Sequence, residues 1–212
     1  MLHHTKIVCR ASKRSLIVSD LPFMTYQINE SQAMTNAARL IQEGGAQSVK
    51  LEGGRNISST VKRLVRNGIP VMGHLGLTPQ SINTLGGYSI QGRDYEDAEN
   101  LVLDALELEQ AGVFALVLEL VPEQLAGFIS QKLSIPTIGI GAGPHCDGQI
   151  QVYHDLLGLY GEFIPRHCKR YGDLEYQIQD MLTKYKSDVE AKQFPTQEHY
   201  TNSQVFSKKN HK

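Results

Sequence analysis

The 212-residue chain has little cysteine, almost no net charge and no long apolar segment, and each absence excludes a class of protein. Its three cysteines, Cys9, Cys146 and Cys168, are too few and too scattered for a disulfide framework or a thiolate metal site. A formal net charge of -1 gives no electrostatic reason to expect binding to nucleic acid or to an anionic membrane surface. No apolar run approaches the roughly 20 residues of a membrane span, and the first residues do not resemble a signal peptide. We therefore expect a cytoplasmic protein that binds neither nucleic acid nor membrane.

What the sequence does contain is an alternation of short apolar runs and helical stretches. Alternating strands and helices predict a parallel sheet, either closed into a barrel or open and doubly wound. No Gly-x-Gly-x-x-Gly motif follows the first run, which argues against a dinucleotide-binding sheet. Residues 149–154 are a candidate for a sixth strand. Five runs have the length of a strand and end in a polar or glycine-rich cluster: Leu16–Asp20, Ser48–Glu52, Ile69–His74, Phe114–Glu119 and Ile135–Gly141.

Helix signals separate these strands. The stretch 73–91 holds too many glycines and prolines for regular structure, which is typical of a functional loop after a strand. Residues 191–212 are polar and without periodicity, so we expect one domain over 1–190 followed by a polar tail. Helices are expected at about residues 2–11, 33–43, 57–66, 94–110, 122–133 and 174–191.

Charged residues stand where the first two runs end, at the edge of the sheet where α/β folds hold their chemistry. Asp20 and Glu52 end these runs, and two carboxylates from neighbouring strands suit a hard cation such as Mg²⁺. The alternative is that each acid caps a helix or is solvated in a loop. Lys50 precedes Glu52 by two residues, so both side chains point to the same face of the strand. That pair either serves an anionic substrate beside a metal or is a plain ion pair on a solvated face.

Two further candidates end the third and fourth runs. His74 follows Gly73, where a histidine is either a catalytic group or a hydrogen-bonded structural group. Glu119 ends the most apolar run, and loss of hydration in such surroundings raises the pKa of a carboxyl group. A raised pKa suits a general base near neutral pH. The competing interpretation is a buried acid paired with a neighbouring basic group.

Several longer segments form an ordered set of motifs. They are Asp20–Phe23, Val49–Gly54, Gly73–Ser81, Gly86–Tyr88 with Gln91–Arg93, Val117–Pro122, and Ile138–Gly143 with Asp147–Ile150. Together these segments resemble the ketopantoate hydroxymethyltransferase family, and the match runs in order from near the start of the chain to about residue 200.

The resemblance implies a (β/α)8 TIM barrel of the phosphoenolpyruvate/pyruvate type that assembles as a homo-oligomer, a decamer. The six expected strands would then be strands three to eight of the barrel. We expect the first two strand-helix units, about 60 residues of a barrel of roughly 250, to be missing from this chain. The second of them would end in a Gly-Asp-Ser motif that supplies another metal-binding aspartate and a serine that contacts the substrate.

The resemblance also implies an activity. A hydroxymethyl group would pass from 5,10-methylenetetrahydrofolate to 3-methyl-2-oxobutanoate, giving ketopantoate on the route to pantothenate and coenzyme A. Asp20 and Glu52 would bind Mg²⁺, and Asp20 would also lie against the substrate. Lys50 and His74 would contact the 2-oxo acid, and Glu119 would be the base. Two alternatives stay open: a related 2-oxo acid lyase, and an inactive short subunit or fragment that associates with full-length copies.

Overall fold

The computed structural model of the chain describes residues 1–161 and 163–202. These residues fall into two compact units, Met1–Ile150 and a second unit that begins at Gln151. The domain boundary that the sequence predicts at residue 190 stays a prediction, and positions 203–212 of the predicted tail lie outside the described residues. Within the described ranges, no helix has the length and apolar character needed to cross a membrane.

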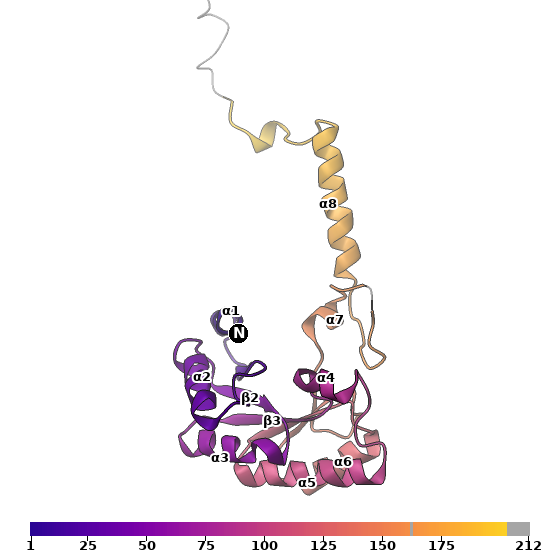
Figure 1. Ribbon diagram of the computed structural model, residues 1–212. Coiled ribbons are helices and arrows are strands. Elements are labelled where there is room, and N and C mark those ends of the chain that lie inside the picture. Colours follow the sequence, from indigo (N-terminus) through magenta and orange to yellow (C-terminus); the bar gives the residue numbers. More distant parts are fainter. Residues whose placement is uncertain (162, 203–212) are drawn as a thin grey trace, which may run out of the picture. The chain divides into compact units, whose positions relative to one another are not determined.

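The first unit is built on one parallel sheet whose spatial order follows the sequence, β1 to β6. Helical segments connect each strand to the next from β1 to β5, and α3, α5 and α6 lie along one side of the sheet (Figure 1). This alternation of strand and helix is that of a (β/α)8-type barrel, and the described residues supply six of its strands. The expected barrel fold is confirmed. The strands are β1 Val18–Asp20, β2 Ser48–Glu52, β3 Val71–Gly76, β4 Ala115–Glu119, β5 Thr137–Ile140 and β6 Gly148–Gln149.

The helices begin and end at recognisable signals. The Asn29 side chain accepts a hydrogen bond from the Gln32 N–H at the start of α2, and Asp94 does the same at the start of α5. Gly112 takes the left-handed conformation that ends α5. The helices of the first unit are α1 Leu2–Ala11, α2 Glu30–Gln42, α3 Ser58–Arg66, α4 Ile82–Leu85, α5 Tyr95–Ala111 and α6 Glu123–Lys132, with the 3-10 turns η1 Arg55–Ile57 and η2 Pro79–Ser81. The second unit holds α7 Tyr153–Leu157, α8 Leu174–Glu190 and the 3-10 turn η3 Gln197–His199.

The core lies between the sheet and these helices. Side chains alternate between the two faces of a strand, and one set of each strand packs on the helix layer. That set includes Val49 and Leu51 of β2 and Leu116 and Leu118 of β4, which join apolar side chains of α3 and α5 in one buried cluster. The opposite face of these strands carries the alternate residues, among them Lys50 and Glu52 of β2, His74 of β3, and Val117 and Glu119 of β4.

The sixth strand is shorter than the sequence predicts, and the prediction of a strand over 149–154 is wrong for most of its length. β6 pairs with β5 only through Gly148 and Gln149, and one further ladder bond runs from the Ile150 N–H to the Gly139 carbonyl. The chain then leaves the sheet and turns into α7, because the Leu156 N–H finds its acceptor at the Val152 carbonyl. Of the stretch 149–154, Gln149 lies in the short strand and Tyr153 and His154 lie in α7, with three residues between the two elements.

Candidate active site

Strand register brings the predicted site residues to one end and one face of the sheet. Asp20 of β1 lies opposite Lys50 of β2, and Glu52 lies opposite His74 of β3. Glu119 ends β4 opposite Gly76, two residues beyond His74 along β3. Because neighbouring strands are parallel and in register, residues that are far apart in sequence meet at their carboxyl ends.

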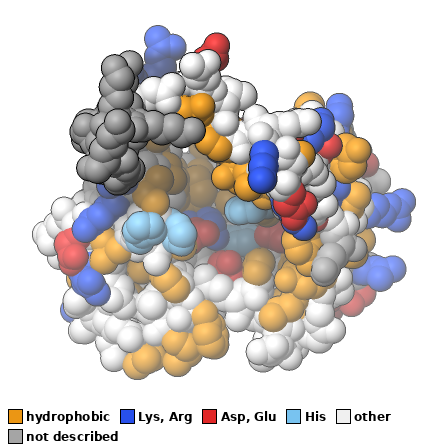
Figure 2. Space-filling model, turned by 90° about the horizontal axis from the view of Figure 1, so that it is seen from above, with side chains coloured by type: hydrophobic (Ala, Val, Ile, Leu, Met, Phe, Trp, Pro, Cys, Tyr) orange, Lys and Arg blue, Asp and Glu red, His pale blue; other side chains and the backbone are white. Residues whose placement is uncertain are grey.

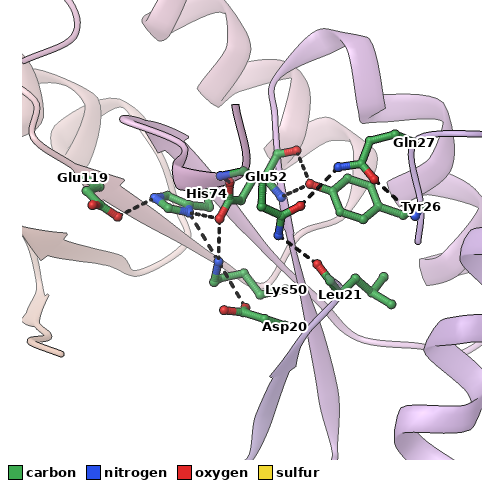
Figure 3. A network of polar contacts seen from close by, with 9 residues as sticks. Asp20, Leu21, Tyr26, Gln27, Lys50, Glu52, His74 and Glu119 are labelled. Atoms are coloured by element: carbon green, nitrogen blue, oxygen red, sulfur yellow. Dashed lines mark hydrogen bonds and ion pairs between the residues drawn. The ribbon is translucent and has the colours of Figure 1, made fainter. Parts of the chain in front are cut away.

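All five side chains join a single row of contacts (Figure 3). Lys50 Nζ lies 3.1 Å from Asp20 Oδ1 and 3.8 Å from Glu52 Oε1. His74 continues the row, with Nδ1 3.5 Å from Glu52 Oε1 and Nε2 3.3 Å from Glu119 Oε2. Carboxylates and nitrogen bases therefore alternate along the row. The structure brings together every site residue that the sequence predicts.

His74 is the most enclosed member of this row. Its Nδ1 lies 3.3 Å from Lys50 Nζ as well as near Glu52, so the partner of Nδ1 depends on the protonation of the ring. Nε2 approaches Glu119 at ion-pair distance, but outside hydrogen-bond geometry, and it is buried without a hydrogen-bond partner among the described residues.

The ionisation of His74 and Glu52 is coupled. Burial by itself lowers the pKa of His74, but contact with the carboxylates of Glu119 and Glu52 outweighs it, and the pKa of the imidazole rises. Burial by itself raises the pKa of Glu52, but contact with His74, the Gln80 N–H and Lys50 outweighs it, and the pKa of this carboxyl falls. Each partner thus favours the charged form of the other.

The two predicted metal ligands offer oxygen donors of the right kind. Among the described residues, no group of three or more His, Cys, Asp or Glu side chains is arranged to hold a metal ion. The carboxylates of Asp20 and Glu52 both contact the ammonium group of Lys50, and 43% of the Asp20 side chain is exposed. Mg²⁺ commonly takes one or two carboxylates and completes its coordination with water and substrate oxygens. The donor set therefore fits Mg²⁺, with Lys50 Nζ lying between the two acids.

Two residues of this region were missed by sequence reasoning. Tyr26 is buried, and its hydroxyl contacts both main-chain groups of Glu52. Gln80 donates its main-chain N–H to Glu52 Oε2 at 3.0 Å. Gln80 lies in the motif Gly73–Ser81, but a main-chain contact leaves no signal in residue type.

Acidic, basic and histidine side chains are also seen together in the recessed centre of the face drawn in Figure 2.

A barrel sheet that gathers acids, a lysine and a histidine at the carboxyl ends of its strands defines an enzyme of the (β/α)8 class. The family profile described as "Ketopantoate hydroxymethyltransferase" matches residues 1–197. The chain belongs to this family and is a transferase by that membership.

Curated relatives carry the name 3-methyl-2-oxobutanoate hydroxymethyltransferase. The protein from Carboxydothermus hydrogenoformans is 54% identical over 199 residues, which cover 94% of this chain and 72% of that protein. The protein from Dehalococcoides mccartyi is 55% identical over 196 residues, which cover 92% of this chain and 70% of that protein. Nearly all of this chain is therefore matched, and it spans about seven tenths of the length of these relatives.

The comparison with solved structures bears on the fold alone. A protein from Burkholderia cenocepacia J2315, which carries a provisional phosphonomutase name, superposes with a TM-score of 0.52 at 13% sequence identity. The superposition covers 89% of this chain and 76% of that protein. It supports the barrel fold that the sequence predicts.

Proposed function

We propose that this chain transfers a hydroxymethyl group from 5,10-methylenetetrahydrofolate to 3-methyl-2-oxobutanoate and so forms ketopantoate, on the route to pantothenate. The observation that carries the proposal is the row Asp20–Lys50–Glu52–His74–Glu119 in a chain of this family. It places cations beside acids at the carboxyl ends of the strands, where a small anionic substrate can reach both.

Glu119 is the base in this proposal. The reaction needs the proton on C3 of the 2-oxo acid removed, after which C3 forms a bond to the methylene carbon of the folate. The two bonds between that carbon and the folate nitrogens break, and water supplies the oxygen of the new hydroxyl group. Glu119 ends a strand of buried apolar residues, and its carboxylate points at His74 Nε2. One carboxylate oxygen lies at ion-pair distance from the imidazole, and the second oxygen remains for the substrate.

Lys50 and the two acids beside it bind the other end of the substrate. The Lys50 ammonium group meets the oxygens on which negative charge develops as the C3 proton leaves, which is where fixed charge helps most. Asp20 and Glu52 would hold Mg²⁺, which supplies a Lewis acid for the keto oxygen. Glu52 is buried and Asp20 is partly exposed, so the open side of the pair faces solvent and incoming substrate.

The test is exchange of the C3 proton of 3-methyl-2-oxobutanoate for deuterium in D₂O with Mg²⁺ present, followed by NMR. The wild-type chain is expected to catalyse exchange, and Glu119→Gln is expected to slow it by at least about 100-fold, since a positioned base contributes that much or more. Glu123→Gln is the matched control, because Glu123 lies four residues on and contacts His145 instead.

Two results would count against this function. Exchange that survives in Glu119→Gln would remove Glu119 from the role of base, and a folded wild-type chain without exchange would argue for an inactive subunit. Cleavage of another 2-oxo acid, with the folate left unconsumed, would instead point to a 2-oxo acid lyase.

A further inference from the structure

The ladder between β1 and β2 stops before it reaches Glu52. Asp20 pairs with Lys50, and the Leu21 N–H donates to the Lys50 carbonyl at 3.1 Å. Beyond Leu21 the chain turns away at Pro22, which cannot donate to a ladder. In a strand, alternate residues direct their main-chain groups to the same neighbour. The N–H and C=O of Glu52 therefore face the side from which β1 has departed.

The Tyr26 hydroxyl takes the place of the departed strand. It accepts a hydrogen bond from the Glu52 N–H at 3.1 Å and donates one to the Glu52 carbonyl at 2.9 Å. Tyr26 is 2% exposed, and burial raises the pKa of its hydroxyl to about 12. The group thus stays protonated at neutral pH and can serve as donor and acceptor at once.

The carboxylate of Glu52 is also fixed by a hydrogen bond, as its main chain is. Oε2 accepts the Gln80 N–H at 3.0 Å, so only Oε1 remains to face Lys50 and His74. The Gln80 side chain donates to the Leu21 carbonyl at 2.9 Å and accepts from Gln27 Nε2 at 3.1 Å. These bonds tie the segment that carries Leu21, Tyr26 and Gln27 to the turn that carries Gln80, and Glu52 is bonded to both.

We propose that Tyr26 is a positioning residue of the active site, whose hydroxyl substitutes for strand β1 and fixes the end of β2 so that Glu52 Oε1 faces Lys50 and His74. This inference rests on the proposed function for its meaning in catalysis. Tyr26 lies behind Glu52 and acts through it. Loss of the hydroxyl leaves two buried main-chain groups unpaired and frees the residue that carries the carboxylate.

A purely structural role would also make the Tyr26 hydroxyl important, so the control must match its chemistry. Thr137→Val removes another buried hydroxyl, one that donates to Asp147 Oδ2 at 2.9 Å. Thr137 begins β5, at the opposite end of the sheet from Glu52. Both Thr137→Val and Tyr26→Phe keep the shape of the side chain and remove only its hydrogen bonds.

The experiment compares the wild-type chain, Tyr26→Phe and Thr137→Val by residue-resolved amide hydrogen exchange and by C3 proton exchange of 3-methyl-2-oxobutanoate. The decisive amide is that of Gln80, which touches the Glu52 carboxylate and does not touch Tyr26. In Tyr26→Phe this amide is expected to exchange about tenfold faster, and kcat for the C3 proton is expected to fall about tenfold. Tyr26→4-aminophenylalanine keeps a hydrogen-bond donor on the ring. It is expected to restore most of the protection of the Gln80 amide and most of kcat.

A Gln80 amide that exchanges in Tyr26→Phe as it does in Thr137→Val would overturn the inference, because the carboxylate would then not depend on the hydroxyl. An equal kcat in these two variants would overturn it as well. If the wild-type chain itself gives no C3 exchange, the proposed function fails, and the Gln80 amide alone decides the role of Tyr26. If Tyr26→Phe does not fold, the comparison of the 4-aminophenylalanine variant with Thr137→Val decides in the same way.

Discussion

At the scale of single residues, the position of His74 between two carboxylates makes stability depend on pH. The folded state raises the pKa of His74 above its ordinary value of 6.5, so the folded chain binds the proton more tightly than the unfolded chain. This contribution is fully present below about pH 6.5 and is lost as the pH rises through the pKa of the folded state. We expect the free energy of unfolding to fall with pH in that window, by at most about 1.4 kcal/mol per pH unit.

Urea unfolding of the wild type and of His74→Gln between pH 5.5 and 9 measures this contribution. The difference between the two curves is expected to shrink as the pH rises, since glutamine has no proton to lose. A difference that stays constant or grows over the window would show that His74 is neutral in the folded state.

Lys50 is the second residue whose contribution to stability follows from its contacts. Its ammonium group is the shared partner of Asp20 and Glu52, so Lys50→Met leaves two carboxylates facing each other. We expect a loss of about 2 kcal/mol in stability, tempered by the exposure of Asp20. Under the proposed function, Mg²⁺ should bind the same pair of acids and restore part of that loss.

Thermal unfolding with and without Mg²⁺ tests this, with Lys132→Met as the control because Lys132 lies over the Phe128 ring instead. A larger rise in Tm on addition of Mg²⁺ in Lys50→Met than in Lys132→Met is expected. No rise in Tm in either variant would contradict a metal site at Asp20 and Glu52.

At the scale of elements, sequence reasoning located the carboxyl ends of the strands and therefore the site. A residue that ends a buried apolar run, such as Glu119, is readable because burial and strand length both leave a pattern. The two-residue spacing of Lys50 and Glu52 likewise predicts a shared face, and the structure places both on one row. The contacts of Tyr26 and Gln80 with Glu52 could not be read in this way, since they depend on how two loops meet in space. The same holds for the early end of β6, which main-chain pairing decides.

Gly76 shows how an element boundary constrains the site. It ends β3 with a φ of 89°, and an added methyl group would collide with the Glu119 carbonyl oxygen, which accepts the Leu77 N–H at 2.8 Å. Gly76→Ala is therefore expected to cost more than about 2 kcal/mol, because backbone strain and a backbone collision add. C3 exchange should also fall, since the collision displaces the end of β4 that carries Glu119.

Gly68→Ala separates the two causes. Gly68 has a similar φ of 83°, but a methyl group there would meet nothing within 4 Å, so strain alone remains and about 1 kcal/mol is expected. Chemical unfolding of both variants gives the comparison. Equal costs would show that the chain around Glu119 yields to the methyl group.

At the scale of the whole molecule, α8 carries an apolar surface. None of its residues is buried, and Ile178, Leu182, Tyr185 and Val189 are all exposed. Their spacing of four, three and four residues places them on one side of the helix, as in the seam of a coiled coil. Since a helix seldom keeps such a stripe in water, α8 is suited to packing against another copy of the chain.

Self-association is therefore the expected state, in agreement with the homo-oligomer that the family resemblance implies. Light scattering after size exclusion should give a mass that is a multiple of the 23.6 kDa of one chain. Leu182→Glu places a charge within the stripe and is expected to lower that mass, because a buried unpaired charge weakens the contact. Ser187→Glu adds the same charge on another side of α8 and should leave the mass unchanged. A wild-type mass of one chain would contradict the prediction, and an equal loss in both variants would assign the contact to some other surface.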